Sequence, residues 1–115
     1  MSYARIQASD GTTTRHEGTP TLEVLQAAVG GDVEVTSLER DADDAAVLWL
    51  NETGKRDGLP VNPRATMLAR LWGNVGDAVI VGNVVLTGHA DRYGSITDLP
   101  DTWLSYLLDG AREPA

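Results

Sequence analysis

Apolar and polar residues alternate with period two near the start of the chain and again around residue 35. This alternation is typical of strands with one buried face, whereas the continuous apolar run at residues 46–50 is typical of a strand buried on both faces. Ser9-Asp10-Gly11 is a turn signal between two strand-like stretches, which predicts a hairpin. The pattern predicts strands at residues 3–8, 12–17, 33–37, 46–50, 78–81 and 84–86.

Three other stretches carry apolar residues at helical spacing. Thr19-Pro20 and Asn62-Pro63 each place a capping side chain before a proline, which is a helix start signal. Glycines follow each apolar stripe, at positions 30, 73 and 110, and mark the helix ends. We therefore predict helices at about residues 20–29, 63–72 and 98–109.

Consecutive strands without intervening helices rule against a purely parallel α/β sheet. We predict a single α+β domain over residues 1–110, with a mixed or mostly antiparallel sheet, helices packed mainly on one face, and a frayed tail at residues 111–115. Gly82-Asn83 can close a hairpin or form a bulge or sharp bend, and the short flanking runs favour the bulge or bend. The stretch 79–86 is open as either an internal strand or an edge that pairs across a dimer.

Composition narrows the classes of function. The chain has 115 residues and no cysteine, which excludes disulfides, thiolate metal sites and cysteine nucleophiles. The formal charge of −8 argues against nucleic-acid binding through a broad basic face and is compatible with a basic protein partner. No apolar run is long enough for a membrane span and no signal peptide is evident, so a cytoplasmic location is expected.

The segment from Asn51 to Arg64 holds the only lysine and three of the nine basic residues. Gly54-Lys55 does not form a phosphate loop, because Trp49 stands where that motif needs glycine and Arg56 where it needs serine or threonine. Two interpretations remain open. The basic side chains form an anion seat at the helix start, or they are solvated in a turn. The candidate ligand residues are Asn51, Lys55, Arg56, Asn62 and Arg64.

An acidic stretch at residues 39–44 is the best candidate surface for a basic protein partner, although an ordinary solvated face is the commoner explanation of such a stretch. Its candidate contact residues are Glu39, Asp41, Asp43 and Asp44. His89 and Asp91 lack a third ligand at a defined spacing, so neither a metal nor a cofactor is expected. No serine lies in a nucleophile elbow, and no complete catalytic signature is evident.

Four ordered motifs run through most of the chain: Val33-x-Val35, Asn51-x-x-Gly54-Lys55, Leu59-Pro60-x-Asn62-x-x-Ala65-Thr66 and Gly76-Asp77-x-Val79-Ile80-Val81-Gly82-Asn83-Val84-Val85. With them the chain resembles the small proteins classed as domain of unknown function 3846. Asn83 departs from the pattern, which more often has an acidic residue there. The resemblance implies an origin in actinobacteria, their phages or their plasmids, and it supplies no activity and no catalytic residues.

The expected function is that of a non-enzymatic interaction protein of a phage, a plasmid or their host, which binds a protein partner or self-associates. A host defence or DNA-metabolism component is the expected kind of partner. The alternative is a small-ligand module that binds a nucleotide or another anion with the Asn51–Arg64 loop and the helix N-terminus.

Overall fold

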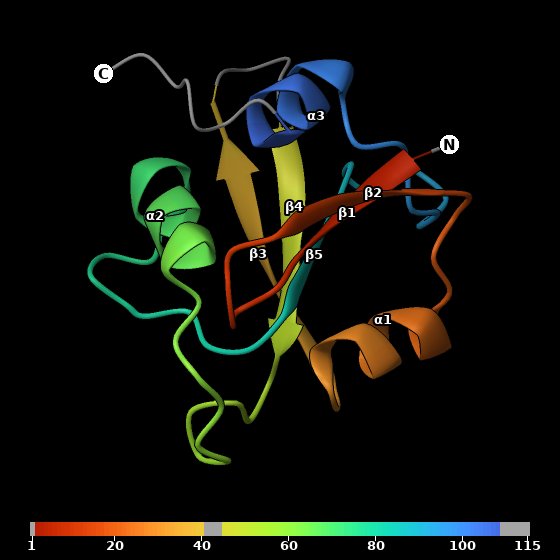
Figure 1. Ribbon diagram of the computed structural model, residues 1–115. Helices are drawn as coiled ribbons and strands as arrows, with labels where there is room; N and C mark the ends of the chain where they lie inside the picture. Colours follow the sequence, from red (N-terminus) through yellow and green to blue (C-terminus); the bar gives the residue numbers. More distant parts are fainter. Residues whose placement is uncertain (1, 41–44, 109–115) are drawn as a thin grey trace.

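A single five-stranded sheet forms the centre of the protein in the computed structural model, which describes residues 2–40 and 45–108 (Figure 1). The strand order is β2-β1-β5-β4-β3, and every neighbouring pair is antiparallel. The predicted α+β fold with a mostly antiparallel sheet is therefore confirmed. The elements are β1 Ser2–Ile6, β2 Thr13–Glu17, α1 Leu22–Val29, β3 Val33–Glu39, β4 Ala45–Asn51, α2 Pro63–Trp72, β5 Val84–Thr87 and α3 Asp101–Leu108.

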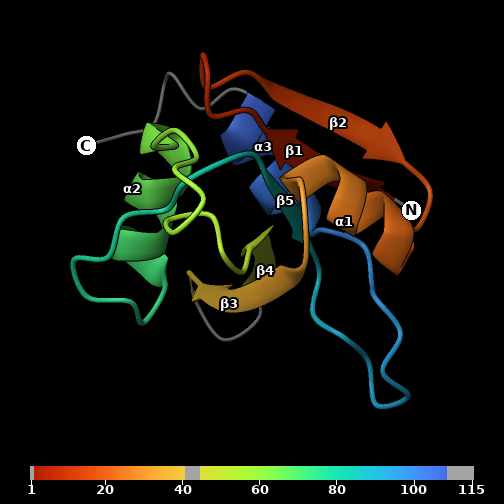
Figure 2. The same ribbon diagram turned by 90° about the horizontal axis from the view of Figure 1, so that it is seen from below.

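The alternation of side chains assigns the two faces of the sheet to different helices. On one face Ala4, Leu48 and Leu86 join the main core with buried residues of α2 and α3. On the other face Tyr3 and Val85 pack in a smaller cluster with buried residues of α1. Two of the three helices that the structure describes thus share a face, as the prediction of helices mainly on one face requires, and α1 covers the opposite side (Figure 2).

The turn between β1 and β2 is the one predicted at Ser9-Asp10-Gly11. Gly11 has a φ of 72°, a backbone conformation that glycine adopts without strain. The Asp10 carboxylate accepts a hydrogen bond of 2.9 Å from the backbone N–H of Thr12. Hydrogen bonds from the Thr12 side chain and backbone lower the pKa of Asp10.

The prediction of a strand at residues 78–81 is wrong. Val81 makes an isolated bridge to Val61, and regular pairing begins only at Val84, opposite Ile6. Gly82 lies between them with a φ of 79°, so the chain bends sharply there and its two sides do not pair as a hairpin. Gly82-Asn83 therefore forms a bend, as the sequence favoured, and not a hairpin turn. Strand β5 is internal to the sheet, between β1 and β4.

The strand buried on both faces is also only partly confirmed. In β4, Ala46, Leu48 and Leu50 are buried on the face of α2 and α3, whereas Val47 and Trp49 on the other face are half-buried. Because α1 is only eight residues long, it does not cover this face completely.

The C-terminal helix begins three residues later than predicted. The backbone N–H of Leu99 donates to the Ser2 carbonyl at 3.0 Å, which attaches the chain before the helix to the start of β1. The predicted frayed tail at residues 111–115 lies outside the described residues. Among the helices that the structure describes, none has the length and apolar character needed to cross a membrane.

Candidate functional site

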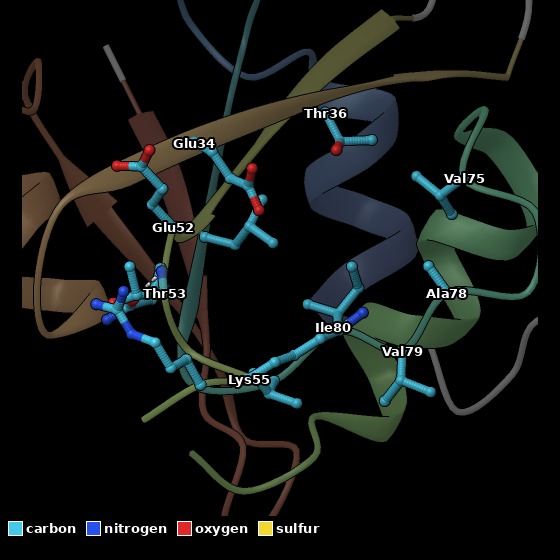
Figure 3. Close-up of a pocket in the computed structure, with 13 residues that line it drawn as sticks. Glu34, Thr36, Glu52, Thr53, Lys55, Val75, Ala78, Val79 and Ile80 are labelled. Carbon is cyan, nitrogen blue, oxygen red and sulfur yellow. Dashed lines mark hydrogen bonds between the residues drawn. The ribbon is translucent and has the colours of Figure 1, made fainter. Parts of the chain in front are cut away.

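A pocket of about 440 Å³ opens beside the edge strand β3 (Figure 3). We call it the β3 pocket. Its floor is formed by Glu34 and Thr36 of β3 with Leu50 of β4. Glu34 is directly opposite Leu50 in the sheet, and Leu50 belongs to the main core, so the pocket lies on the face that α2 and α3 cover. Its walls are the turn at residues 51–56 and the segment 75–81 after α2.

The pocket exists because the helical layer stops short of the end of β3. A Cβ atom added to Gly73, just after α2, would lie 3.2 Å from Cγ2 of Thr36 and 3.3 Å from Cδ2 of Leu38. The end of α2 therefore packs directly on the middle of β3. Beyond it the chain turns at Gly76, where φ is 62°, and returns as the far wall of the pocket. None of the described helices lies over the part of the sheet around Glu34.

The near wall is anchored by Asn51, which is buried at the end of β4. Its Nδ2 donates to the carbonyl of Val29 at 3.1 Å, and its Oδ1 accepts from the backbone N–H of Thr53 at 2.8 Å. The turn is therefore tied to the end of α1 on one side and closed on itself on the other. Asn51 lines the pocket mainly as the support that positions Lys55 and Arg56.

Charges of both signs line the pocket around the apolar side chain of Leu50. Glu34 and Glu52 lie together on one side of the pocket and Lys55 lies on another, as Figure 3 shows. Within the part of the chain that the structure describes, no hydrogen bond or ion pair engages these three side chains. Arg56 lies 3.7 Å from Asp57, and both side chains are exposed, so this ion pair contributes little to stability.

Asn62 and Arg64 do not join this pocket. Asn62 is fully buried: its Nδ2 donates to the carbonyls of Ile6 and Gly82, and its Oδ1 caps α2 at Ala65. The Arg64 guanidinium turns in another direction, toward β2 and α3.

The guanidinium of Arg64 makes two hydrogen bonds. Its Nη1 donates to Oγ1 of Thr13 at 2.7 Å, and its Nη2 donates to the carbonyl of Leu107 at 2.5 Å. The predicted convergence of Lys55, Arg56 and Arg64 is therefore not found, because the first turn of α2 directs Arg64 away from the loop. A ligand role for Asn51, Lys55 and Arg56 stays a prediction.

Of the predicted protein contacts, only Glu39 lies in the described part of the chain. It is exposed at the end of β3 and lines a shallow hollow with His89 and Asp98. Asp41, Asp43 and Asp44 lie outside the described residues. In residues 2–40 and 45–108, no group of three His, Cys, Asp or Glu side chains is placed to hold a metal ion.

Two features were missed by the sequence analysis. No site was predicted at Glu34 and Thr36, although period-two alternation around residue 35 places both side chains on one face of the strand. Exposed Val61, Met67 and Leu71 line an apolar groove of about 520 Å³ on the outer side of α2. Met67 and Leu71 are four residues apart, so helical spacing could have revealed this second stripe.

Comparison with known proteins adds a family and no activity. The family model described as a domain of unknown function (DUF3846) matches residues 4–110, which is nearly the whole chain. Comparisons with curated proteins and with solved structures found no match. The match extends from β1 through α3 and includes every residue of the β3 pocket. The chain belongs to the DUF3846 family.

Proposed function

We propose that this protein is a non-enzymatic interaction protein and that it binds a protein partner at the β3 pocket. The observation that carries the proposal is the state of the pocket rim. Glu34, Glu52 and Lys55 surround the pocket without a hydrogen bond or ion pair among the described residues. Charged side chains that are not used to stabilise the fold are available to select a partner.

The character of the partner follows from the charge of the chain. A net charge of −8 repels acidic surfaces and attracts basic ones. This attraction raises the rate at which a basic partner associates and orients the partner as it approaches. A partner with a basic segment is therefore proposed. In the phage or plasmid setting that the family resemblance implies, a host defence or DNA-metabolism protein is the kind of partner we propose.

A charge reversal at the pocket rim tests this proposal. Glu34→Lys should reduce recovery of the partner at least ~10-fold, because like charges placed against each other at an interface cost several kcal/mol. The measurement is affinity capture from cells that carry the gene, with each captured protein quantified by mass spectrometry.

Glu23→Lys is the matched control, since Glu23 is an exposed glutamate in the first turn of α1, on the opposite face of the sheet. Proteins recovered with the wild type and with Glu23→Lys but lost with Glu34→Lys are those that the proposal predicts. If the wild type, Glu34→Lys and Glu23→Lys recovered the same proteins in equal amounts, the β3 pocket would not be the interaction site.

The second candidate function is a small-anion module, and the size of the pocket favours it. A volume of about 440 Å³ lies within the range of small-ligand pockets, and Lys55 and Arg56 supply positive charge at the rim. Lys55→Ala should then abolish the thermal stabilisation produced by an added nucleotide or inorganic phosphate, whereas Arg92→Ala, an exposed arginine in a distant loop, should retain it. Stabilisation that persists in Lys55→Ala would reject this candidate.

A further inference from the structure

Strand β3 is an open edge of the sheet. Among residues 2–40 and 45–108 it pairs only with β4, and Figure 2 places it at the border of the described chain with β4 on its inner side. The backbone N–H of Glu52 donates to the Asp32 carbonyl at 2.8 Å, which makes this a hydrogen-bonded pair. Such pairs recur at every second residue of an antiparallel ladder. The backbone groups of Val33, Val35 and Ser37 therefore point outward, away from β4.

Charge is the main device that protects this edge from strand pairing. Natural edges are protected by charged side chains, by proline, by bulges or by very short length. The seven residues of β3 contain neither lysine nor proline, and their register with β4 is continuous from Val33 opposite Asn51 to Glu39 opposite Ala45. Val35 is 55 % exposed, and a neighbouring strand would cover it.

The charges on this edge select the kind of strand that can pair with it. Asp32, Glu34 and Glu39 are acidic, and residues 32–39 include no basic residue. Two copies of β3 paired edge to edge would bring these carboxylates together on chains that each carry a net charge of −8, which opposes a second copy as the occupant. A basic extended segment meets no such repulsion.

The β3 pocket lies beside this edge, on the face to which Glu34 and Thr36 point. Alternate side chains of a strand added to β3 would project over the same face. The pocket offers such a side chain the apolar surface of Leu50, with the carboxylates of Glu34 and Glu52 together on one side and Lys55 on another. The side that holds the two carboxylates suits an aliphatic stem that ends in a cation, as in lysine or arginine.

We propose that an extended, basic segment of the protein partner adds to β3 as a sixth strand and places a lysine or arginine side chain in the β3 pocket. The inference rests on the proposed function, because it specifies how the partner is recognised. Backbone hydrogen bonds to Val33, Val35 and Ser37 supply affinity, and the pocket supplies selectivity.

The test uses a display library of random ten-residue peptides selected against the full chain. Enriched peptides should contain lysine or arginine among β-prone residues. Synthetic versions should slow amide hydrogen exchange at least ~10-fold at Val35 and Ser37, whose N–H groups point outward, with a smaller change at Glu34 and Thr36, which are already paired with β4.

Two further measurements distinguish strand addition from simple charge attraction. A peptide N-methylated at every second residue loses the donors on one edge, so one of its two methylation patterns should abolish binding and the other should not. Val35→Pro removes an outward N–H that makes no bond to β4 and should weaken binding at least ~10-fold, whereas Val35→Thr should not.

The possible failures are separable. Peptides that bind along α2 near Met67 and Leu71, or that tolerate both methylation patterns, would overturn strand addition and leave a protein-binding function intact. Failure to enrich any peptide would also overturn it. In the capture experiment the proposed function itself fails if Glu34→Lys recovers the same proteins from cells as the wild type.

Discussion

Asn62→Ala should lower the free energy of unfolding by about 3 kcal/mol and the melting temperature by about 10 °C. The side chain is fully buried and makes three hydrogen bonds, two of them from Nδ2 to the carbonyls of Ile6 and Gly82 and one from the backbone N–H of Ala65 to Oδ1. Alanine removes the cap of α2 and leaves two buried carbonyls without this donor. The large effect follows because one amide joins β1, α2 and the bend before β5.

Urea denaturation of the wild type and of Asn62→Ala measures this loss. The comparison holds if the slope of the free energy of unfolding against urea concentration is the same for both proteins. Asn62→Ser is the control, because a serine hydroxyl can still cap the helix but cannot reach both carbonyls. It should cost about 2 kcal/mol, less than alanine. A loss below about 1 kcal/mol for Asn62→Ala would mean that the two carbonyls find other donors.

Trp103→Ala should destabilise the protein by about 4 kcal/mol. The indole is fully buried in the main core. Its ring centroid lies 5.4 Å from that of Trp72 and 6.3 Å from that of Tyr106, with both pairs close to perpendicular. The guanidinium carbon of Arg40 lies 5.4 Å from the Trp103 ring. Alanine removes this packing and leaves a cavity beneath α3.

The matched change is Trp49→Ala on the other face of the sheet. Trp49 is only half-buried, and its Nε1 donates to Oγ1 of Thr87 at 2.9 Å, so its removal should cost about 2 kcal/mol. Urea denaturation compares the two variants. If Trp49→Ala were the more damaging change, the main core would not be the principal source of stability.

Local signals in the sequence account for most of the fold. Asn62 was predicted as an N-cap and accepts the N–H of Ala65, and the prediction for α2 matches its bounds. For α1 the predicted cap, Thr19, is wrong by two residues. Thr21 caps the helix through the N–H of Val24. The sequence Thr-Pro-Thr offers two hydroxyls, and the structure uses the second as the cap.

The candidate site was harder to predict because it depends on contacts between distant parts of the chain. Lys55 and Arg64 are close in sequence, yet the fold places one at the β3 pocket and the other against β2. Glu34 and Ile80 are far apart in sequence, yet both line the pocket. No periodic pattern reports such an approach, because it depends on where α2 ends over the sheet.

The aromatic residues also combine features that the local sequence predicts with features that depend on contacts between distant residues. Trp72 and Trp103 lie on apolar stripes with helical spacing, and in the structure Trp103 is fully buried in the main core with Trp72 packed against the same cluster. The position of Arg40 could not be predicted. Its guanidinium carbon lies between 5.0 and 5.4 Å from the ring centres of Tyr106, Trp72 and Trp103, a cation–π arrangement created by folding.

Native mass spectrometry of the protein, purified at low salt from cells that carry its gene, tests the central claim most directly. The proposed function predicts a complex with a second polypeptide that is present for the wild type and absent for Glu34→Lys. A chain that instead carries only a bound molecule of a few hundred daltons, lost in Lys55→Ala, would contradict the interaction protein and establish the small-ligand module.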